Sequence, residues 1–318
     1  MSFDHPVLSS LLPVVLLIGV GFVAGRARLV RPESVRDLSN LVFLVLTQAL
    51  LFRTMSSVHL ERLEFHPVLQ YFVVAGGLFF AMLLVYGRDS RASVLALAGI
   101  FSNTLMIGVP LIGLAYGPAG QVLLFTLISL HALVLLTLAT VVLELQMARE
   151  QAFVSGQKGQ LWRTVAQAIR SAVLHPVPLP IIVGLLYAQT GWGLHPVVDK
   201  PLQLLGSAFG PIALVLVGIT LSQTPIGKNL GPALKLSLVK TLLHPVLMLA
   251  VGWALGLRGL ALSVMVVAAA LPIGANVFLF SQRYRKEEDT VTAAVAVSTL
   301  LSMLGISVAM ALLSLLPA

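Results

Sequence analysis

The amino-acid sequence predicts an all-α polytopic membrane protein of ten transmembrane helices, built as two inverted five-helix repeats with one broken helix in each. Three observations predict this fold. Hydrophobic residues make up 58% of the 318 residues and charged residues only 10%, whereas soluble domains contain about 25% charged residues. The apolar residues gather in long segments separated by short polar connections. Two of these segments carry an Asn and a Pro near their middle, where an ordinary transmembrane helix has neither.

A helix that crosses a bilayer needs about 20 mostly apolar residues. On this rule the predicted spans are residues 7–25, 36–57, 67–86, 91–117, 119–146, 168–190, 196–222, 231–256, 258–282 and 289–316. The longest polar stretch, Met147–Arg170, divides the chain near its middle. We therefore expect residues 1–150 to form the first repeat and residues 151–318 the second. Because each half has an odd number of spans, the second half inserts with the opposite orientation, which is the inverted repeat of many secondary transporters.

The distribution of Lys and Arg predicts the orientation. If the spans are numbered in order, 16 of the 20 basic residues fall on one side of the membrane, including Lys240 in the eighth span. The other side has Arg53, Arg62, Lys200 and Arg258. By the positive-inside rule the first side is cytoplasmic. We therefore expect a multi-pass protein of the cell inner membrane with both termini on the non-cytoplasmic side.

The same composition excludes several classes of function. The net charge of +8 comes from short clusters between apolar runs, so it indicates membrane topology and not nucleic-acid binding. The chain has no cysteine, and it contains no HExxH or GxSxG motif and no paired aspartates within a span. We therefore expect no enzyme, no cofactor and no metal site.

The two interrupted segments are Phe101–Leu111 (FSNTLMIGVPL) and Leu271–Phe280 (LPIGANVFLF). Pro110 and Pro272 lack an N–H group and their rings clash with the preceding turn, so each is expected to break or kink its helix. Freed backbone groups at membrane depth are tolerated only where protein or a water-filled cavity satisfies them. Two such breaks in corresponding positions of two half-chains predict the binding site of a secondary transporter.

At these residues the chain resembles the auxin efflux carrier family, which includes plant carriers and bacterial malonate-type transporters. The matching stretches are Asn103–Leu111, Ala270–Phe278, Gln282–Tyr284 and Ser298–Ser302. The resemblance implies an elevator-type carrier of small organic anions with a fold like that of the bile-acid symporters. It further implies that spans 1, 2, 6 and 7 form a scaffold, that spans 3–5 and 8–10 move, and that the carrier is a homodimer in contact with lipid. The chain departs from the family at Gln48, where a proline is usual.

Asn103 and Asn276 are the main candidates for binding the substrate. Each lies where the N-terminus of a half-helix presents free N–H groups and the positive end of a helix dipole, which suits a carboxylate. An Asn amide both donates and accepts hydrogen bonds. The alternative is that each Asn caps its own broken helix. Weaker candidates are Ser102, Thr104, Ser129 and Gln48.

Two titratable residues within spans are candidates for coupling or for a counter-charge to the anion. Lys240 could balance the substrate, could carry a proton, or could extend along the helix to the cytoplasmic face. His131 could titrate near neutral pH or could be a packed hydrogen-bonding residue. A sodium-coupled carrier of the bile-acid symporter type is the alternative function, and the sodium dependence of uptake separates the two. Malonate-like dicarboxylates and indole-type monocarboxylates both remain open as substrates.

Overall fold

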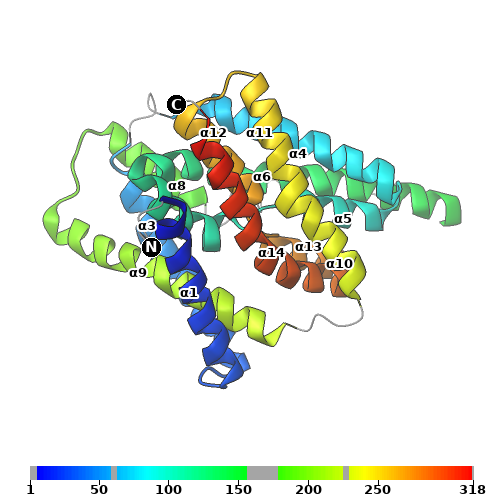
Figure 1. The fold of residues 1–318 in the computed structure, drawn as a ribbon, viewed down its shortest axis with the longest axis horizontal. Helices are drawn as coiled ribbons and strands as arrows, with labels where there is room; N and C mark the ends of the chain where they lie inside the picture. Colours follow the sequence, from blue (N-terminus) through cyan, green and yellow to red (C-terminus); the bar gives the residue numbers. More distant parts are fainter. Residues whose placement is uncertain (1–5, 59–62, 156–177, 225–228, 317–318) are drawn as a thin grey trace.

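A computed structural model describes residues 6–58, 63–155, 178–224 and 229–316, and within these ranges the chain is helical almost throughout (Figure 1). Three of the helices, labelled η, are π-helices. In chain order the helices are α1 (Pro6–Arg26), α2 (Pro32–Leu41), η1 (Val42–Leu46), α3 (Thr47–Met55), α4 (Phe65–Tyr86), α5 (Ser90–Ile100), η3 (Thr104–Gly108), α6 (Val109–Ser155), α8 (Pro178–Gln189), α9 (Pro196–Gln223), α10 (Leu230–Leu238), η5 (Val239–Leu243), α11 (His244–Ala254), α12 (Gly259–Ala270), α13 (Ala275–Tyr284) and α14 (Glu288–Ser314).

Among the described residues, six continuous helical segments are long and apolar enough to cross a membrane. They are Glu33–Met55, Phe65–Tyr86, Thr104–Met147, Pro196–Gln223, Leu230–Ala254 and Glu288–Ser314. Shorter apolar helices occupy the other predicted spans. Residues 168–177 of the predicted sixth span lie outside the described residues. The prediction of an all-helical, multi-pass membrane fold is therefore confirmed.

The helices form two groups that lie side by side in Figure 1. One group contains α1, α3, α8 and α9, in which α1 packs along α9 and α3 packs against α8 and α9. The other contains α4, α5 and α10 to α14, and α6 contacts both groups. The α1–α9 contact depends on glycine, because a Cβ atom on Gly218 would lie 2.0 Å from the carbonyl oxygen of Ile18. Small residues allow this close backbone approach inside a bilayer.

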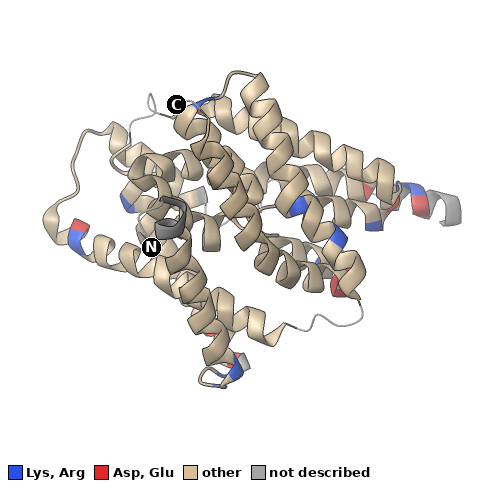
Figure 2. Ribbon diagram, in the orientation of Figure 1, with Lys and Arg blue, Asp and Glu red and all other residues tan. Residues whose placement is uncertain are grey.

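Most Lys, Arg, Asp and Glu residues lie at helix ends and in loops, and the helix bodies are largely free of charge (Figure 2). This is the distribution that the cost of burying charge in a bilayer requires. Lys240 is the exception, since its side chain is fully buried.

Both predicted helix breaks are confirmed. The first consists of Phe101–Asn103, between α5 and η3, and the second of Leu271–Gly274, between α12 and α13. Pro272 lies in the second break as predicted.

The prediction for Pro110 is wrong, because Pro110 is the second residue of α6 and the first break lies upstream of it. Because η3 runs directly into α6, Pro110 is the seventh residue of the helical segment that starts at Thr104, and it does not interrupt that segment. The π-helix η3 directly precedes α6, and η5 precedes Pro245 at the same spacing. In a regular α-helix the proline ring would clash with the carbonyl group one turn earlier, and the wider π-turn avoids this clash.

The predicted boundary between the fourth and fifth spans is a sharp turn inside α6. Gly117 has φ 62° and ψ −158°, and Pro118 follows it. A positive φ of this kind is readily adopted only by glycine. The helix then continues to Ser155, so the start of the polar stretch Met147–Arg170 is helical and not a loop.

Candidate functional site

The two non-helical segments run antiparallel and hydrogen-bond to each other. The backbone N–H of Asn103 donates to the carbonyl of Pro272 at 2.8 Å, and that of Gly274 donates to the carbonyl of Phe101 at 3.0 Å. These two bonds form an isolated β-bridge between Ser102 and Ile273. Each break therefore satisfies part of the backbone that the other exposes, as membrane depth requires.

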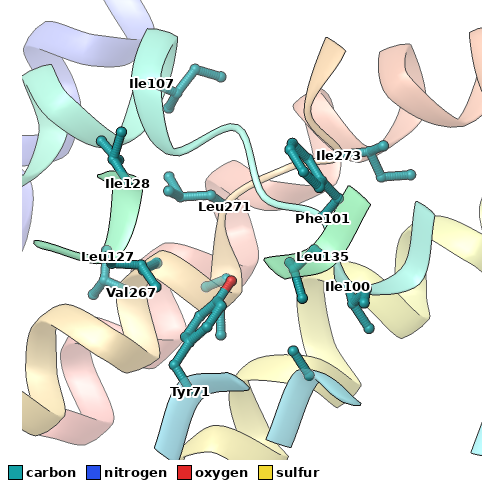
Figure 3. Packing of buried hydrophobic residues seen from close by; sticks show 14 of the residues in the cluster. Tyr71, Ile100, Phe101, Ile107, Leu127, Ile128, Leu135, Val267, Leu271 and Ile273 are labelled. Atoms are coloured by element: carbon teal, nitrogen blue, oxygen red, sulfur yellow. The ribbon is translucent and has the colours of Figure 1, made fainter. Parts of the chain in front are cut away.

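Gly274 allows this close crossing. A Cβ atom at this position would lie 2.9 Å from the Phe101 ring and 3.0 Å from the Ser102 carbonyl oxygen. Figure 3 shows Phe101 and Ile273 beside each other where the segments meet, with the Tyr71 ring directed at them from α4. Tyr71, Phe101 and Ile273 are all buried.

Neutral groups support the first break. The hydroxyls of Tyr71 and Ser102 are 2.9 Å apart and share a hydrogen bond. The side-chain Oδ1 of Asn103 accepts from the backbone N–H of Met106 at 3.2 Å and so caps the helical segment that starts at Thr104. Tyr71 was not predicted as a site residue from the sequence. The signal available there was a hydroxyl-bearing ring within an otherwise apolar span, which at depth needs a hydrogen-bond partner.

The side chains of Lys240 and Ser298 support the second break. Lys240 Nζ donates to the carbonyl oxygens of Ala269 at 2.5 Å and Leu271 at 2.7 Å, at the C-terminal end of α12. The Ser298 hydroxyl oxygen accepts from the backbone N–H of Ile273 at 3.1 Å. The Lys240 side chain therefore neither extends to the membrane surface nor enters the cavity described next.

A cavity of about 70 Å³ lies at the crossing. Five of the predicted site residues line it, and they are Ser102, Asn103, Thr104, His131 and Asn276. The other lining residues are Phe43, Phe101, Leu105, Met106, Ile128, Ala132, Gly274 and Ala275. Since a water molecule occupies about 30 Å³ in the liquid, this volume suits a group the size of a carboxylate.

The side chains of the two asparagines differ in their hydrogen bonding. Asn103 caps its own helix through Met106. Asn276 is the second residue of α13, whose N-cap is Gly274, and within the described part of the chain its amide makes no hydrogen bond. Its half-buried side chain borders the cavity. The capping interpretation therefore applies to Asn103 and not to Asn276.

His131 closes the cavity on the side of α6. Its ring packs edge-on against Phe101, with ring centroids 4.5 Å apart, and lies 5.9 Å from the Tyr71 ring. Its buried Nε2 atom has no hydrogen-bond partner among the described residues. The expectation of a packed residue holds for the ring, but that nitrogen is available to a ligand or water.

The remaining candidates lie elsewhere. The Gln48 side chain donates to the Phe43 carbonyl at 3.0 Å, and the Ser129 hydroxyl donates to the Thr126 carbonyl at 2.7 Å. Neither borders the crossing cavity. Pro110 borders a separate cavity of about 430 Å³ between α1, α3, α6 and α9.

That larger cavity contains Arg53, a possible attractant for anions. Arg53 is paired with Asp199, however, through Nε–Oδ1 at 2.7 Å and Nη2–Oδ2 at 3.1 Å. A bidentate pair of this kind leaves little net charge for a ligand. The crossing cavity is smaller, and neither cavity has an acidic side chain in its lining.

Multi-pass helical proteins in which two broken helices meet at a cavity that contains a few polar side chains are typical membrane transporters. The chain belongs to the family described as membrane transport protein, which matches residues 6–310 and includes the auxin efflux carriers. Several relatives cover almost the whole chain, and three of them follow. Auxin efflux carrier component 8 of Arabidopsis thaliana is 21% identical, over 94% of this chain and 95% of its own length. A Rhizobium meliloti (strain 1021) protein named "Putative malonate transporter" is 25% identical over 92% of this chain and 91% of its own length. Uncharacterized transporter YfdV of Escherichia coli (strain K12) is 23% identical over 92% of this chain and 93% of its own length.

Proposed function

We propose that this protein is a secondary transporter of small organic anions, with Asn103 and Asn276 binding the carboxylate. One observation carries the proposal. The N-terminal ends of two helical segments, which start at Thr104 and Ala275, meet at one cavity together with both asparagine amides. Helix N-termini carry partial positive charge and free N–H groups, so they stabilise an anion without a buried countercharge.

The family supports small carboxylic acids as the substrate class. Two of the relatives are named for auxin and for malonate, so a monocarboxylate and a dicarboxylate are both candidates here. The 70 Å³ cavity holds a carboxylate, and the rest of a substrate molecule requires a wider state of the cavity.

An elevator-type movement provides that wider state. Phe43 of η1 is the one lining residue from the group that contains α1, α3, α8 and α9, with which η1 is continuous through α3. The other lining residues belong to the crossing segments and to η3, α6 and α13. Sliding of the crossing helices past η1 would remove the Phe43 wall and open the cavity to one side of the membrane at a time.

The proposal also includes the topology and the assembly. The clustering of Lys and Arg supports an inner-membrane protein with both termini on the non-cytoplasmic side. The resemblance to the auxin efflux carriers supports a homodimer embedded in lipid, in which spans 1, 2, 6 and 7 form the scaffold.

Uptake into proteoliposomes tests the function. The probes are radiolabelled malonate and radiolabelled indole-3-acetate, chosen to separate dicarboxylates from monocarboxylates. We expect saturable uptake of at least one probe, with strong loss in Asn276→Ala. Uptake should be unchanged in the control Ser129→Ala, which removes a hydroxyl group outside the cavity. Wild-type uptake rates in both Asn103→Ala and Asn276→Ala would contradict the site.

A further inference from the structure

The C-terminal ends of α1 and α9 border a basic pocket that is separate from both cavities described above. Its volume is about 630 Å³, within the range of about 300–1,000 Å³ that is usual for small-molecule sites. Figure 2 shows Lys and Arg gathered at this lower end of α1. The lining residues with polar side chains are Arg26, Arg28, Arg31, Ser222 and Gln223.

No acidic side chain neutralises the three arginines. Among the described residues none of the three forms a salt bridge, and the pocket lining includes no Asp or Glu. The acidic residues that follow along the chain, Glu33 and Asp37 of α2, do not border the pocket. Arg31 is the N-cap of α2 but its side chain does not cap that helix, whose N-terminal end adds partial positive charge. The pocket therefore suits an anion that accepts several hydrogen bonds from guanidinium groups.

Arg28 lies at a backbone position that favours glycine. Its φ is 55°, and its N–H donates to the Gly25 carbonyl at 3.1 Å. The N–H of Leu29 donates to the Ala24 carbonyl at 3.0 Å. These two bonds form a Schellman motif, in which the left-handed residue is usually glycine because a Cβ atom is unfavourable there. The positive-inside rule explains basic residues near a helix end but not an arginine at this position, so the strained residue beside the pocket indicates a role for its side chain.

The surface next to the pocket is apolar. Leu29, which lies between the arginines in the chain, is 78% exposed, and Phe22 and Val23 on the last turns of α1 are exposed as well. Exposed apolar residues at the end of a transmembrane helix can contact acyl chains, while neighbouring arginines reach the headgroups. Basic pockets between membrane helices on the cytoplasmic side are typical sites for anionic lipid headgroups. This combination favours a lipid over a soluble anion.

We propose that this pocket binds the headgroup phosphate of an anionic phospholipid through Arg26, Arg28 and Arg31. The distribution of Lys and Arg supports a cytoplasmic position for the pocket, where the leaflet carries anionic lipid. The site belongs to the group of helices that contains α1, α3, α8 and α9, and it does not include any residue of the crossing. Its occupation is therefore independent of the transported anion.

The test is the melting temperature of the purified full-length protein, stripped of lipid in a neutral detergent and titrated at constant ionic strength. The probes are dioleoylphosphatidylglycerol, dioleoylphosphatidylcholine and sodium phosphate. Phosphatidylglycerol should stabilise the wild type saturably, by about 5 °C when it is well above its dissociation constant. Phosphatidylcholine, whose headgroup has no net charge, and inorganic phosphate, which lacks acyl chains, should give little or no shift.

Arg28→Gly separates the side chain from the backbone, because it relieves the positive φ and removes the charge. Without lipid its melting temperature should equal that of the wild type or exceed it by up to about 2 °C. Its apparent dissociation constant for phosphatidylglycerol should rise about 10-fold, as expected for the loss of a charge-assisted hydrogen bond. Arg26→Gln, which changes no strained residue, should weaken the binding to a similar degree.

Arg285→Gly is the matched control. Arg285 has φ 52°, and it ends α13 in the same motif, with its N–H bonded to the Gln282 carbonyl at 3.2 Å and that of Lys286 to the Ser281 carbonyl at 3.1 Å. It does not border the pocket, so Arg285→Gly should bind phosphatidylglycerol as the wild type does. An unchanged dissociation constant in Arg28→Gly, an equal loss in Arg285→Gly, or an equal shift with phosphatidylcholine or inorganic phosphate would overturn the proposal. The measurement uses no organic-anion substrate, so its outcome is separate from that of the transport assay.

Discussion

The break between α5 and η3 is held by hydroxyl and amide groups, whereas the break between α12 and α13 is held by the buried Lys240 amino group together with the Ser298 hydroxyl. Their backbones pair with each other, through Asn103 with Pro272 and Gly274 with Phe101. Their side chains are not equivalent. Asn103 is engaged in capping its helix, and Asn276 has no such role. Asn103 therefore both caps a helix and borders the cavity, whereas Asn276 borders the cavity without capping its helix.

The largest expected effect separates these two asparagines. Loss of a hydrogen bond to a charged ligand costs about 1.5–3 kcal/mol, so Asn103→Ala and Asn276→Ala should each lower uptake about 10- to 100-fold. Only Asn103→Ala should also lose stability, by about 1 kcal/mol, because it removes a helix cap. Uptake and thermal unfolding of the same preparations check this. Equal destabilisation by the two substitutions would contradict the division of roles.

A second difference concerns two glycines that pack against the crossing, Gly274 in the second break and Gly108 at the end of η3. Gly274→Ala places a methyl group against the Phe101 ring and the Ser102 carbonyl, which are fixed by the crossing. We expect a loss of about 2 kcal/mol, as for overpacked cores. Gly108→Ala meets the end of the Leu271 side chain at 2.8 Å, which can rotate, so its loss should be below about 1 kcal/mol. Chemical or thermal unfolding of both variants gives the order, and a greater loss for Gly108→Ala would show that the crossing is the looser of the two contacts.

The smallest effects distinguish the hydroxyl groups. Ser298→Ala leaves the buried N–H of Ile273 without its acceptor, which should cost about 1.5 kcal/mol. Tyr71→Phe leaves the Ser102 hydroxyl, which can rotate to another acceptor, so about 0.5–1 kcal/mol is expected. Thermal unfolding of both variants, with Ser129→Ala as a control outside the crossing, measures the difference. A reversed order would mean that the first break depends more on its polar support than the second.

The helix breaks could be predicted from the sequence because proline, glycine and asparagine change the backbone locally. The place of the first break could not, since the π-turn before Pro110 allows the proline to continue a helix. The contacts of Lys240 with Ala269 and Leu271, about 30 residues further along the chain, depend on tertiary packing and give no local signal. Asn103 and Asn276 could be predicted as a pair because each lies beside a local backbone signal. Tyr71 and Phe43 reach the same site only through tertiary packing, so they were not identified from the sequence.

The central claim is that an organic anion binds where the two breaks cross. The most direct measurement is an experimental density map of the purified protein with malonate or indole-3-acetate, using whichever raises the melting temperature more. The account predicts carboxylate density within hydrogen-bonding distance of the Asn103 and Asn276 amides, at the start of α13. Ligand density in the cavity beside Arg53, between α1, α3, α6 and α9, with the crossing empty would contradict it.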